Sequence, residues 1–124
     1  MSVTINKTTS SSAEITWEPS ADDTHGNIVY SIESEQLAYA LQALGDEAGA
    51  GYDPDIPEAR ALSAAMHTTR LARALETRAA VQVVHLRDHY GLSWRRIATA
   101  IHDDPDMQST VRRQYDSGLR YLLT

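Results

Sequence analysis

The order of hydrophobic and polar positions divides the chain into an N-terminal part with strand-like alternation and a longer part with helical spacing. Three short sets of apolar residues alternate with polar ones: Val3 and Ile5; Ile15 and Trp17; and Ile28, Tyr30 and Ile32. Each set predicts a strand, and together they predict a small antiparallel sheet. Two segments between them are not predicted as strands. Thr8–Ser12 lacks apolar residues and is predicted to be a loop or a flexible hairpin tip, and Glu18–Asn27, which carries Pro, Gly, Asn and Asp, is predicted to be a loop.

A first helix is expected to begin at Ser34. The hydroxyl of Ser34 can accept a hydrogen bond from a free N–H group at a helix start, and Glu35 is favourable beside the positive end of the helix dipole. Gly45 is expected to end this helix. The segment Gly45–Pro57 contains three Gly and two Pro, so it predicts a linker.

Helical spacing is strongest after Pro57, which can occupy the first position of a helix. Apolar residues recur at intervals of three to five, mostly four, from Leu62 to Tyr90, among many alanines. This pattern predicts either one long helix or two helices separated near Leu75–Thr77. Gly91 is expected to end the helical stretch in both cases.

The last third of the chain predicts a short helix, a turn and a second helix. Ser93 can cap the short helix, and Trp94 is expected to pack in the core. The apolar face of this helix comprises Trp94, Ile97 and Ile101. His102–Asp106 predicts a turn, and residues 107–123 predict the final helix. The buried face of that helix is expected to hold Met107, Val111, Tyr115, Leu119 and Leu122, and its opposite face Ser109, Arg112, Arg113, Asp116 and Arg120.

These elements predict a mainly α protein with a small N-terminal antiparallel β element, an α+β fold that ends in a helix-turn-helix. The linker divides the chain into two parts, residues 1–55 with the strands and first helix, and residues 56–124 with the helical domain. The 124 residues suit one compact domain or one small domain with a structured extension.

Charge is distributed unequally between the two parts. Residues 1–59 contain one base against eleven acids, a net charge of −10, whereas residues 60–124 contain ten arginines against six acids, a net charge of +4. The total of −6 is unusual for a nucleic-acid-binding protein, but the basic half has the expected sign. On the last helix, Asp116 is expected to pair with the neighbouring arginines.

Part of the C-terminal half resembles a known family. Its segments Leu86–Arg87, Gly91–Ala98 (Gly-Leu-Ser-Trp-Arg-Arg-Ile-Ala), Ser109–Arg113 and Leu119–Leu122 resemble the promoter-reading C-terminal region of bacterial sigma factors and related helix-turn-helix regulators. In that family the helix that carries the segment matching Ser109–Arg113 (Ser-Thr-Val-Arg-Arg) lies in the major groove of DNA. The resemblance therefore implies that four side chains lie nearest the bases: Ser109, Thr110, Arg112 and Arg113.

The preferred hypothesis is a small DNA-binding transcriptional regulator that inserts helix 107–123 into the major groove of double-stranded DNA. Guanidinium groups can neutralise phosphates or pair with guanine. The expected DNA-binding residues are Arg95, Arg96, Ser109, Thr110, Arg112, Arg113 and Arg120. Because a single helix-turn-helix contacts few phosphates, a homodimer is expected, with the N-terminal part as the dimerisation or partner-binding part.

Two alternatives remain open at the level of the sequence. The sigma-like fold could bind a protein of the transcription machinery instead of DNA, which would agree with the negative net charge and with the acidic turn His102–Asp106. That turn is also longer than the tight turn of the family. The acidic N-terminal half could otherwise cover the basic helix until a partner or ligand removes it.

No enzymatic activity, cofactor or metal is expected. His85 and His89 are spaced as helical zinc ligands can be, but the sequence between them lacks the catalytic Glu of a zinc protease helix. The aspartates at 103, 104 and 106 lack the Gly and final Glu of a calcium loop. Without an apolar run of membrane length, the protein is expected to be cytoplasmic and nucleoid-associated, with no membrane contact.

Overall fold

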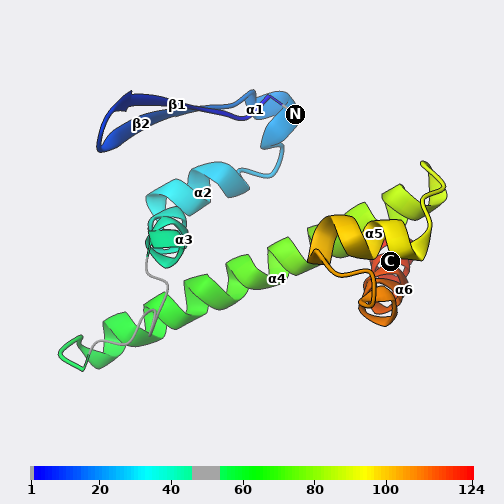
Figure 1. Cartoon of the computed structure of the whole chain (residues 1–124). Helices are drawn as coiled ribbons and strands as arrows, with labels where there is room; N and C mark the ends of the chain where they lie inside the picture. The colour runs from blue at the N-terminus through cyan, green and yellow to red at the C-terminus, as the bar shows by residue number, and fades with distance from the viewer. Residues whose placement is uncertain (1, 46–53) are drawn as a thin grey trace. The chain divides into compact units, whose positions relative to one another are not determined.

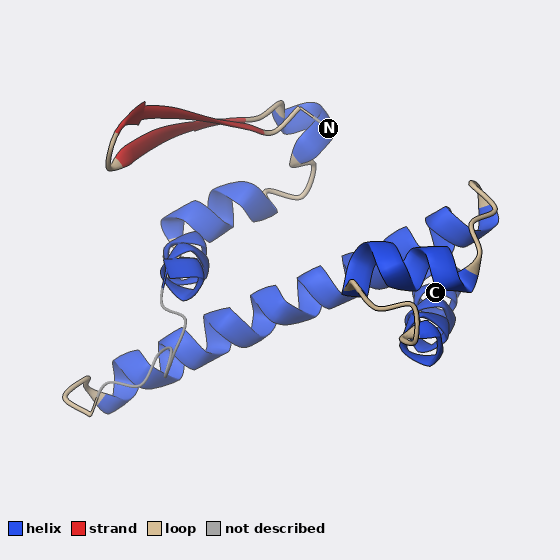
Figure 2. Ribbon diagram, in the orientation of Figure 1, coloured by secondary structure: helices blue, strands red, loops and turns tan. Residues whose placement is uncertain are grey.

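The computed structural model describes residues 2–45 and 54–124, which are mainly helical with one small antiparallel sheet at the N-terminal end (Figures 1 and 2). The predicted α+β class is therefore confirmed. In chain order the elements are β1 (Thr4–Thr9), β2 (Ser12–Thr16), α1 (Pro19–Asp22), α2 (Asn27–Glu33), α3 (Gln36–Gly45), α4 (Glu58–Asp88), α5 (Trp94–His102) and α6 (Gln108–Leu123). None of the described helices combines the length and the apolar character that a membrane span requires.

The chain forms two compact units, Met1–Thr68 and Thr69–Thr124, which we call unit 1 and unit 2. The division falls inside α4, whereas the sequence placed it between residues 55 and 56. The first part of α4 therefore belongs with the strands and short helices, and its second part belongs with α5 and α6.

Strands β1 and β2 form an antiparallel hairpin in which Ile5 lies opposite Ile15. The register shifts once between Lys7 and Thr9. The turn comprises only two residues, 10 and 11, so the predicted hairpin tip lies within Thr8–Ser12, but the predicted segment is too long at both ends. The strands extend further because Thr has a high strand propensity even where no apolar residue anchors the chain.

Asp22 joins the start of the hairpin to α1. Its carboxylate accepts hydrogen bonds from the backbone N–H of Ser2 (3.3 Å), from that of Glu18 (3.1 Å) and from the Ser2 hydroxyl. The hydrogen bond from the Ser2 hydroxyl, followed by that from the Glu18 backbone, lowers the pKa of Asp22 below its usual value. Helix α1 lies within the predicted loop Glu18–Asn27, so that prediction was wrong where Pro19 starts a helical turn.

The third predicted strand is wrong, because residues 27–33 form α2. Both carboxylate oxygens of Asp23 accept hydrogen bonds at the start of this helix, from the N–H of Ile28 (2.8 Å) and of Val29 (3.2 Å). Gly26 before it has a left-handed backbone conformation, φ 74°, which glycine adopts without strain. The segment 28–32 also fits a helix, because the apolar Val29 interrupts the alternation of polarity, and here the hydrogen bonds to Asp23 favour the helix.

Ser34 does not begin the next helix. Its N–H donates to the carbonyl of Tyr30 (2.8 Å), so Ser34 closes α2. Glu35 follows with φ 67°, and its carbonyl accepts from the N–H of Tyr39 (3.0 Å) in the first turn of α3. Helix α3 extends to Gly45, as predicted. Most of the predicted linker Gly45–Pro57 lies outside the described residues.

Helix α4 is a single helix of 31 residues, so the break considered near Leu75–Thr77 does not occur. It starts one residue after Pro57, whose carbonyl accepts hydrogen bonds from the first turn. Its end agrees with the predicted stop at Gly91, which has φ 65°. Beyond this residue the N–H of Leu92 donates back to the carbonyl of Leu86 (3.2 Å).

The core of unit 2 lies where α4, α5 and α6 meet. It consists of Val83, Ile97, Ala98 and Val111, all at most 2% exposed, with Leu86, Leu92, Trp94, Met107 and Tyr115 packed around it. Gly118 is also buried and lies directly against α4, since a Cβ built on it would be 2.7 Å from Val84 Cγ2 and would overlap the Ala80 carbonyl. The predicted inner face of α6 is thus correct at Val111 and wrong at Leu122, which is 57% exposed.

Unit 1 is packed quite differently. In its described part no hydrophobic side chain is buried, and its one buried residue is His67, which is 5% exposed and stacks on Tyr39 with ring centroids 5.8 Å apart. Exposed apolar side chains include Ile5 (65%) and Leu44 (80%). Unit 1 therefore offers apolar surface to a ligand or partner.

We expect Gly118→Ala to destabilise the protein by about 1–3 kcal/mol, because a methyl group has no space between α6 and α4. Helix propensity alone would give the opposite sign, a gain of about 1 kcal/mol. Urea unfolding of the wild type, Gly118→Ala and the control Asp116→Ala, which is exposed on the same helix, measures the difference. A more stable Gly118→Ala protein would contradict the close crossing.

Candidate nucleic-acid interface

Helices α5 and α6, with the turn between them, form the helix-turn-helix arrangement that the sequence predicted (Figure 1). Ser93 caps α5, because its hydroxyl accepts a hydrogen bond from the N–H of Arg96 (3.1 Å). Ile97 and Ala98 on the inner side are fully buried, which leaves Arg95 and Arg96 exposed on the first turn. The N-terminus of α5 therefore presents two exposed guanidinium groups to solvent.

The acidic turn is ordered by its own backbone and by Asp104. One Asp104 carboxylate oxygen accepts from the N–H of Asp106 (2.9 Å), and the Asp104 carbonyl accepts from the N–H of Met107 (3.2 Å). Asp103 adopts φ 54°, which Asp tolerates better than most residues. One of the three carboxylates is thus used inside the turn, while Asp103 and Asp106 are exposed.

A polar contact fixes the end of α5 against α6. The His102 ring Nε2 and the Gln114 side-chain oxygen are 3.0 Å apart. Both residues are half-buried. Together with the Ile97–Val111 core, this contact orients α6 about its own axis.

The outward face of α6 follows from this orientation. At ~100° per residue, four exposed side chains fall within about 60° of one another and opposite Val111. They are Ser109, Arg113, Asp116 and Arg120. We call this set the α6 outer face.

Arg112 and Thr110 lie at the two sides of the α6 outer face. Arg112 is exposed, but its guanidinium is 5.5 Å from the ring centroid of Trp94. Thr110 is half-buried, and its hydroxyl accepts from Arg113 at 3.5 Å. The structure therefore groups three of the predicted α6 residues (Ser109, Arg113, Arg120) and sets these two apart.

Trp94 packs at the edge of the core, and the guanidinium groups of Arg87 and Arg112 lie over its ring. It is half-buried, with the ring of Tyr115 edge-on at 5.2 Å. The Arg87 guanidinium lies 4.4 Å from its centroid and also donates to the Leu92 carbonyl (2.8 Å). Arg87 was not among the predicted DNA-binding residues, although it lies in the segment Leu86–Arg87 that resembles the sigma factors. Arg87 and Arg112 form a second basic pair beside the α6 outer face.

The expected ion pairs of Asp116 are not formed. Within residues 2–45 and 54–124 no salt bridge links it to Arg112, Arg113 or Arg120. Arg120 donates instead to the Ser117 hydroxyl (3.1 Å). Asp116 therefore forms no ion pair with the guanidinium groups of the α6 outer face.

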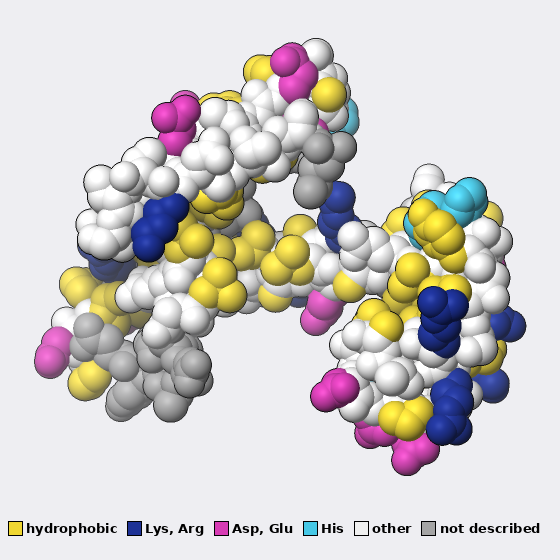
Figure 3. Space-filling model, turned by 45° about the horizontal axis from the view of Figure 1, so that its top comes forward, with side chains coloured by type: hydrophobic (Ala, Val, Ile, Leu, Met, Phe, Trp, Pro, Cys, Tyr) yellow, Lys and Arg dark blue, Asp and Glu magenta, His cyan; other side chains and the backbone are white. Residues whose placement is uncertain are grey.

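The charge of unit 2 has the sign that a phosphate backbone requires. Residues 69–124 contain nine arginines against six acids. Figure 3 shows arginine side chains gathered along one side of this unit, with acidic side chains at its lower edge. Phosphate contact is therefore favoured on one side of the unit and opposed at the other.

His85 and His89 stack on each other instead of converging on a point. Their ring planes are 6° apart with centroids at 4.8 Å, and Tyr90 lies edge-on to both. In the part of the chain that the structure describes, no group of three His, Cys, Asp or Glu side chains could hold a metal ion.

Comparisons with known proteins give no relative: no family model matches the chain, and no curated protein or solved structure is significantly similar to it. The geometry of unit 2 is therefore the basis for any functional assignment.

The hydrogen bond from Tyr115 to Asp88 (2.7 Å) predicts an alkaline transition. Because the Asp88 carboxylate accepts from the neutral phenol, the pKa of Tyr115 is raised above its usual value. A folded pKa above the unfolded one means that the bond stabilises the protein below about pH 10 and is lost as the pH rises through the higher value. In an NMR titration, assigned with Tyr115→Phe, Tyr115 should ionise at higher pH than an exposed tyrosine.

Asp88→Asn should return the pKa of Tyr115 toward its usual value, whereas the control Asp106→Asn should leave it unchanged. An unaltered titration in Asp88→Asn would contradict the hydrogen bond and with it the packing of α6 on the end of α4.

Proposed function

We propose that the protein is a small DNA-binding transcriptional regulator whose unit 2 lays α6 in the major groove. The observation that carries this proposal is the α6 outer face, a strip of side chains at a helix surface with two arginines that form no ion pair with described residues. Guanidinium forks and a hydroxyl are the groups that read base edges and phosphates.

The roles differ between the residues. Arg113, Arg120 and Ser109 face the groove, where the two guanidinium groups also contact the phosphates at its edges, with Ser109 near the start of α6 closest to the bases. Arg95 and Arg96 at the N-terminus of α5 bind the backbone phosphates, as first helices of such modules do. Arg112, with Arg87 beside it on Trp94, is assigned to phosphate contact, and Thr110 to a supporting position.

The proposal extends to the assembly and the location of the protein. A homodimer doubles the number of phosphate contacts, which a single module needs for selectivity at physiological salt. Unit 1 supplies the dimer contact through the exposed side of α2, where Val29 (39%), Tyr30 (48%) and Ile32 (43%) present apolar surface. The protein would act in the cytoplasm on the nucleoid, without catalysis.

A second candidate function is binding to a protein of the transcription machinery through the same unit. It is favoured by the two exposed carboxylates of the turn, Asp103 and Asp106, which would oppose a phosphate backbone. A partner with a basic surface would attract the acidic turn, and the net charge of −6 of the whole chain would not oppose its binding.

DNA binding is tested by fluorescence polarisation with random-sequence duplex DNA over a salt series. Wild-type affinity should fall with salt, and the slope of log K against log salt should be shallower by about 2 in Arg113→Gln/Arg120→Gln, at ~0.9 per lost phosphate contact. The matched control Arg60→Gln/Arg70→Gln removes two exposed arginines of α4 and should keep the wild-type slope.

Equal slopes in both double variants would remove the α6 outer face from the interface. Absence of wild-type binding even near ~50 mM salt would reject DNA as the target and favour the protein partner.

Self-association is tested by sedimentation velocity. The wild type should form a dimer, and Val29→Ser/Ile32→Ser should sediment as a monomer, because the change removes apolar contact area from α2. The control Leu44→Ser alters a more exposed leucine of α3 and should remain dimeric. A monomeric wild type at micromolar concentration would refute the dimer.

A further inference from the structure

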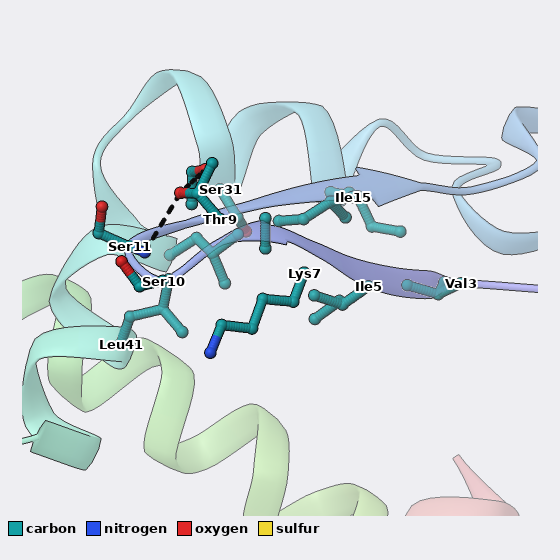
Figure 4. Close-up of a pocket in the computed structure, with 13 residues that line it drawn as sticks. Val3, Ile5, Lys7, Thr9, Ser10, Ser11, Ile15, Ser31 and Leu41 are labelled. Atoms are coloured by element: carbon teal, nitrogen blue, oxygen red, sulfur yellow. Dashed lines mark hydrogen bonds between the residues drawn. The ribbon is translucent and has the colours of Figure 1, made fainter.

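A groove in unit 1 lies between one face of the β1–β2 hairpin and helices α2 and α3 (Figure 4). Its volume is about 600 Å³, within the range of pockets that hold small molecules. All of its lining residues fall between 3 and 41, so the groove belongs to unit 1 alone. It is separate from the α6 outer face and from the exposed side of α2.

The lining changes in polarity along the hairpin. At the open end of the strands it is formed by Val3, Ile5, Ile15 and Ile28. At the turn end it is formed by the hydroxyl residues Thr9, Ser10, Ser11 and Ser12, with Ser31 of α2 opposite and Leu41 of α3 beside Ser10. Figure 4 shows this order, with Val3, Ile5 and Ile15 at one end and Ser10, Ser11 and Ser31 at the other.

Lys7 lies between the two ends. It is the one lysine of the chain and the one base among residues 1–59. In Figure 4 its side chain extends from β1 alongside Ile5 toward Leu41. No carboxylate lines the groove, and Lys7 forms no salt bridge with a described residue. The otherwise acidic stretch of residues 1–59 thus places its one base in an apolar groove.

Two of the four hydroxyl groups at the turn end are available to donate a hydrogen bond to a ligand. Thr9 and Ser12 are hydrogen-bonded to each other through their hydroxyls (2.5 Å). The hydroxyls of Ser10 and Ser11 make no hydrogen bond to any described residue and point to solvent or to a ligand. A bound anion could accept from both of them and from the Lys7 ammonium.

We propose that this groove binds a free aliphatic carboxylate, with the chain along Val3, Ile5, Ile15 and Ile28 and the carboxylate between Lys7 and the hydroxyls of Ser10 and Ser11. The four residue steps from Val3 to Lys7 span about 13 Å of extended chain, comparable to an extended decanoyl chain. The bound chain would cover side chains that are otherwise open to water, such as Ile5 at 65% and Leu41 at 56% exposed. The site is independent of DNA binding.

Isothermal titration calorimetry of the full chain with decanoate, below the concentration at which decanoate aggregates, tests this site. We expect binding of one decanoate per chain, at least tenfold weaker binding of uncharged decanol, and loss of that difference in Lys7→Met. Lys7→Arg should keep the preference for decanoate. The control Glu14→Gln changes one charge on the same hairpin outside the groove and should bind as the wild type does.

Three results would overturn the proposal: no decanoate binding at millimolar concentration, equal binding of decanoate and decanol by the wild type, or an unchanged preference in Lys7→Met. Many decanoate molecules per chain would equally overturn it, since they indicate surfactant adsorption. Circular dichroism confirms that each variant is folded. If Ile5→Gln dissociates a wild-type dimer while decanoate has no effect, a second copy fills the groove and the carboxylate assignment is wrong.

Discussion

The close crossing of α6 over α4 at Gly118 is the constraint on which the geometry of unit 2 depends. Because the backbone of α6 touches the Ala80 carbonyl and the Val84 side chain, α6 cannot rotate about its axis without a clash. Val111 then points into the core with Ile97, and the side chains half a turn away face solvent. The same contact therefore holds the fold together and selects the residues that can reach a groove.

Periodicity predicted most of unit 2 because its helices bury one face each. The Ser93 cap, the turn after His102 and the exposed arginines of α6 all follow from local pattern and spacing. Local pattern and spacing did not predict which arginines of α6 point away from the core and which lies at the side of the helix. Arg112 and Arg113 are adjacent and chemically identical, but they lie ~100° apart around the helix, and a tertiary contact with the ring of Trp94 holds Arg112 at the side. Gly118 was missed because a helical glycine has no periodic signal.

Unit 1 was predicted less well, and for a physical reason. No hydrophobic face of its described part is buried, so the pattern of apolar residues does not determine its local structure. Side-chain carboxylates do so instead, since Asp23 caps α2 and Asp22 joins α1 to the start of β1. Such hydrogen bonds depend on short-range geometry that alternation of polarity does not report, which explains why residues 27–33 were predicted as a strand.

The acidic turn is compatible with DNA binding only if its charges are kept from the phosphates. Asp104 is held by the turn itself, so two carboxylates of the turn remain, and Asp116 on the α6 outer face is a third. Four arginines on α5 and α6 lie outside the Trp94 ring: Arg95, Arg96, Arg113 and Arg120. At physiological salt, charges more than ~8 Å apart are largely screened from one another. The net effect on a bound duplex is therefore set by which side of unit 2 faces it, not by the total charge of the chain, and on the arginine side attraction prevails.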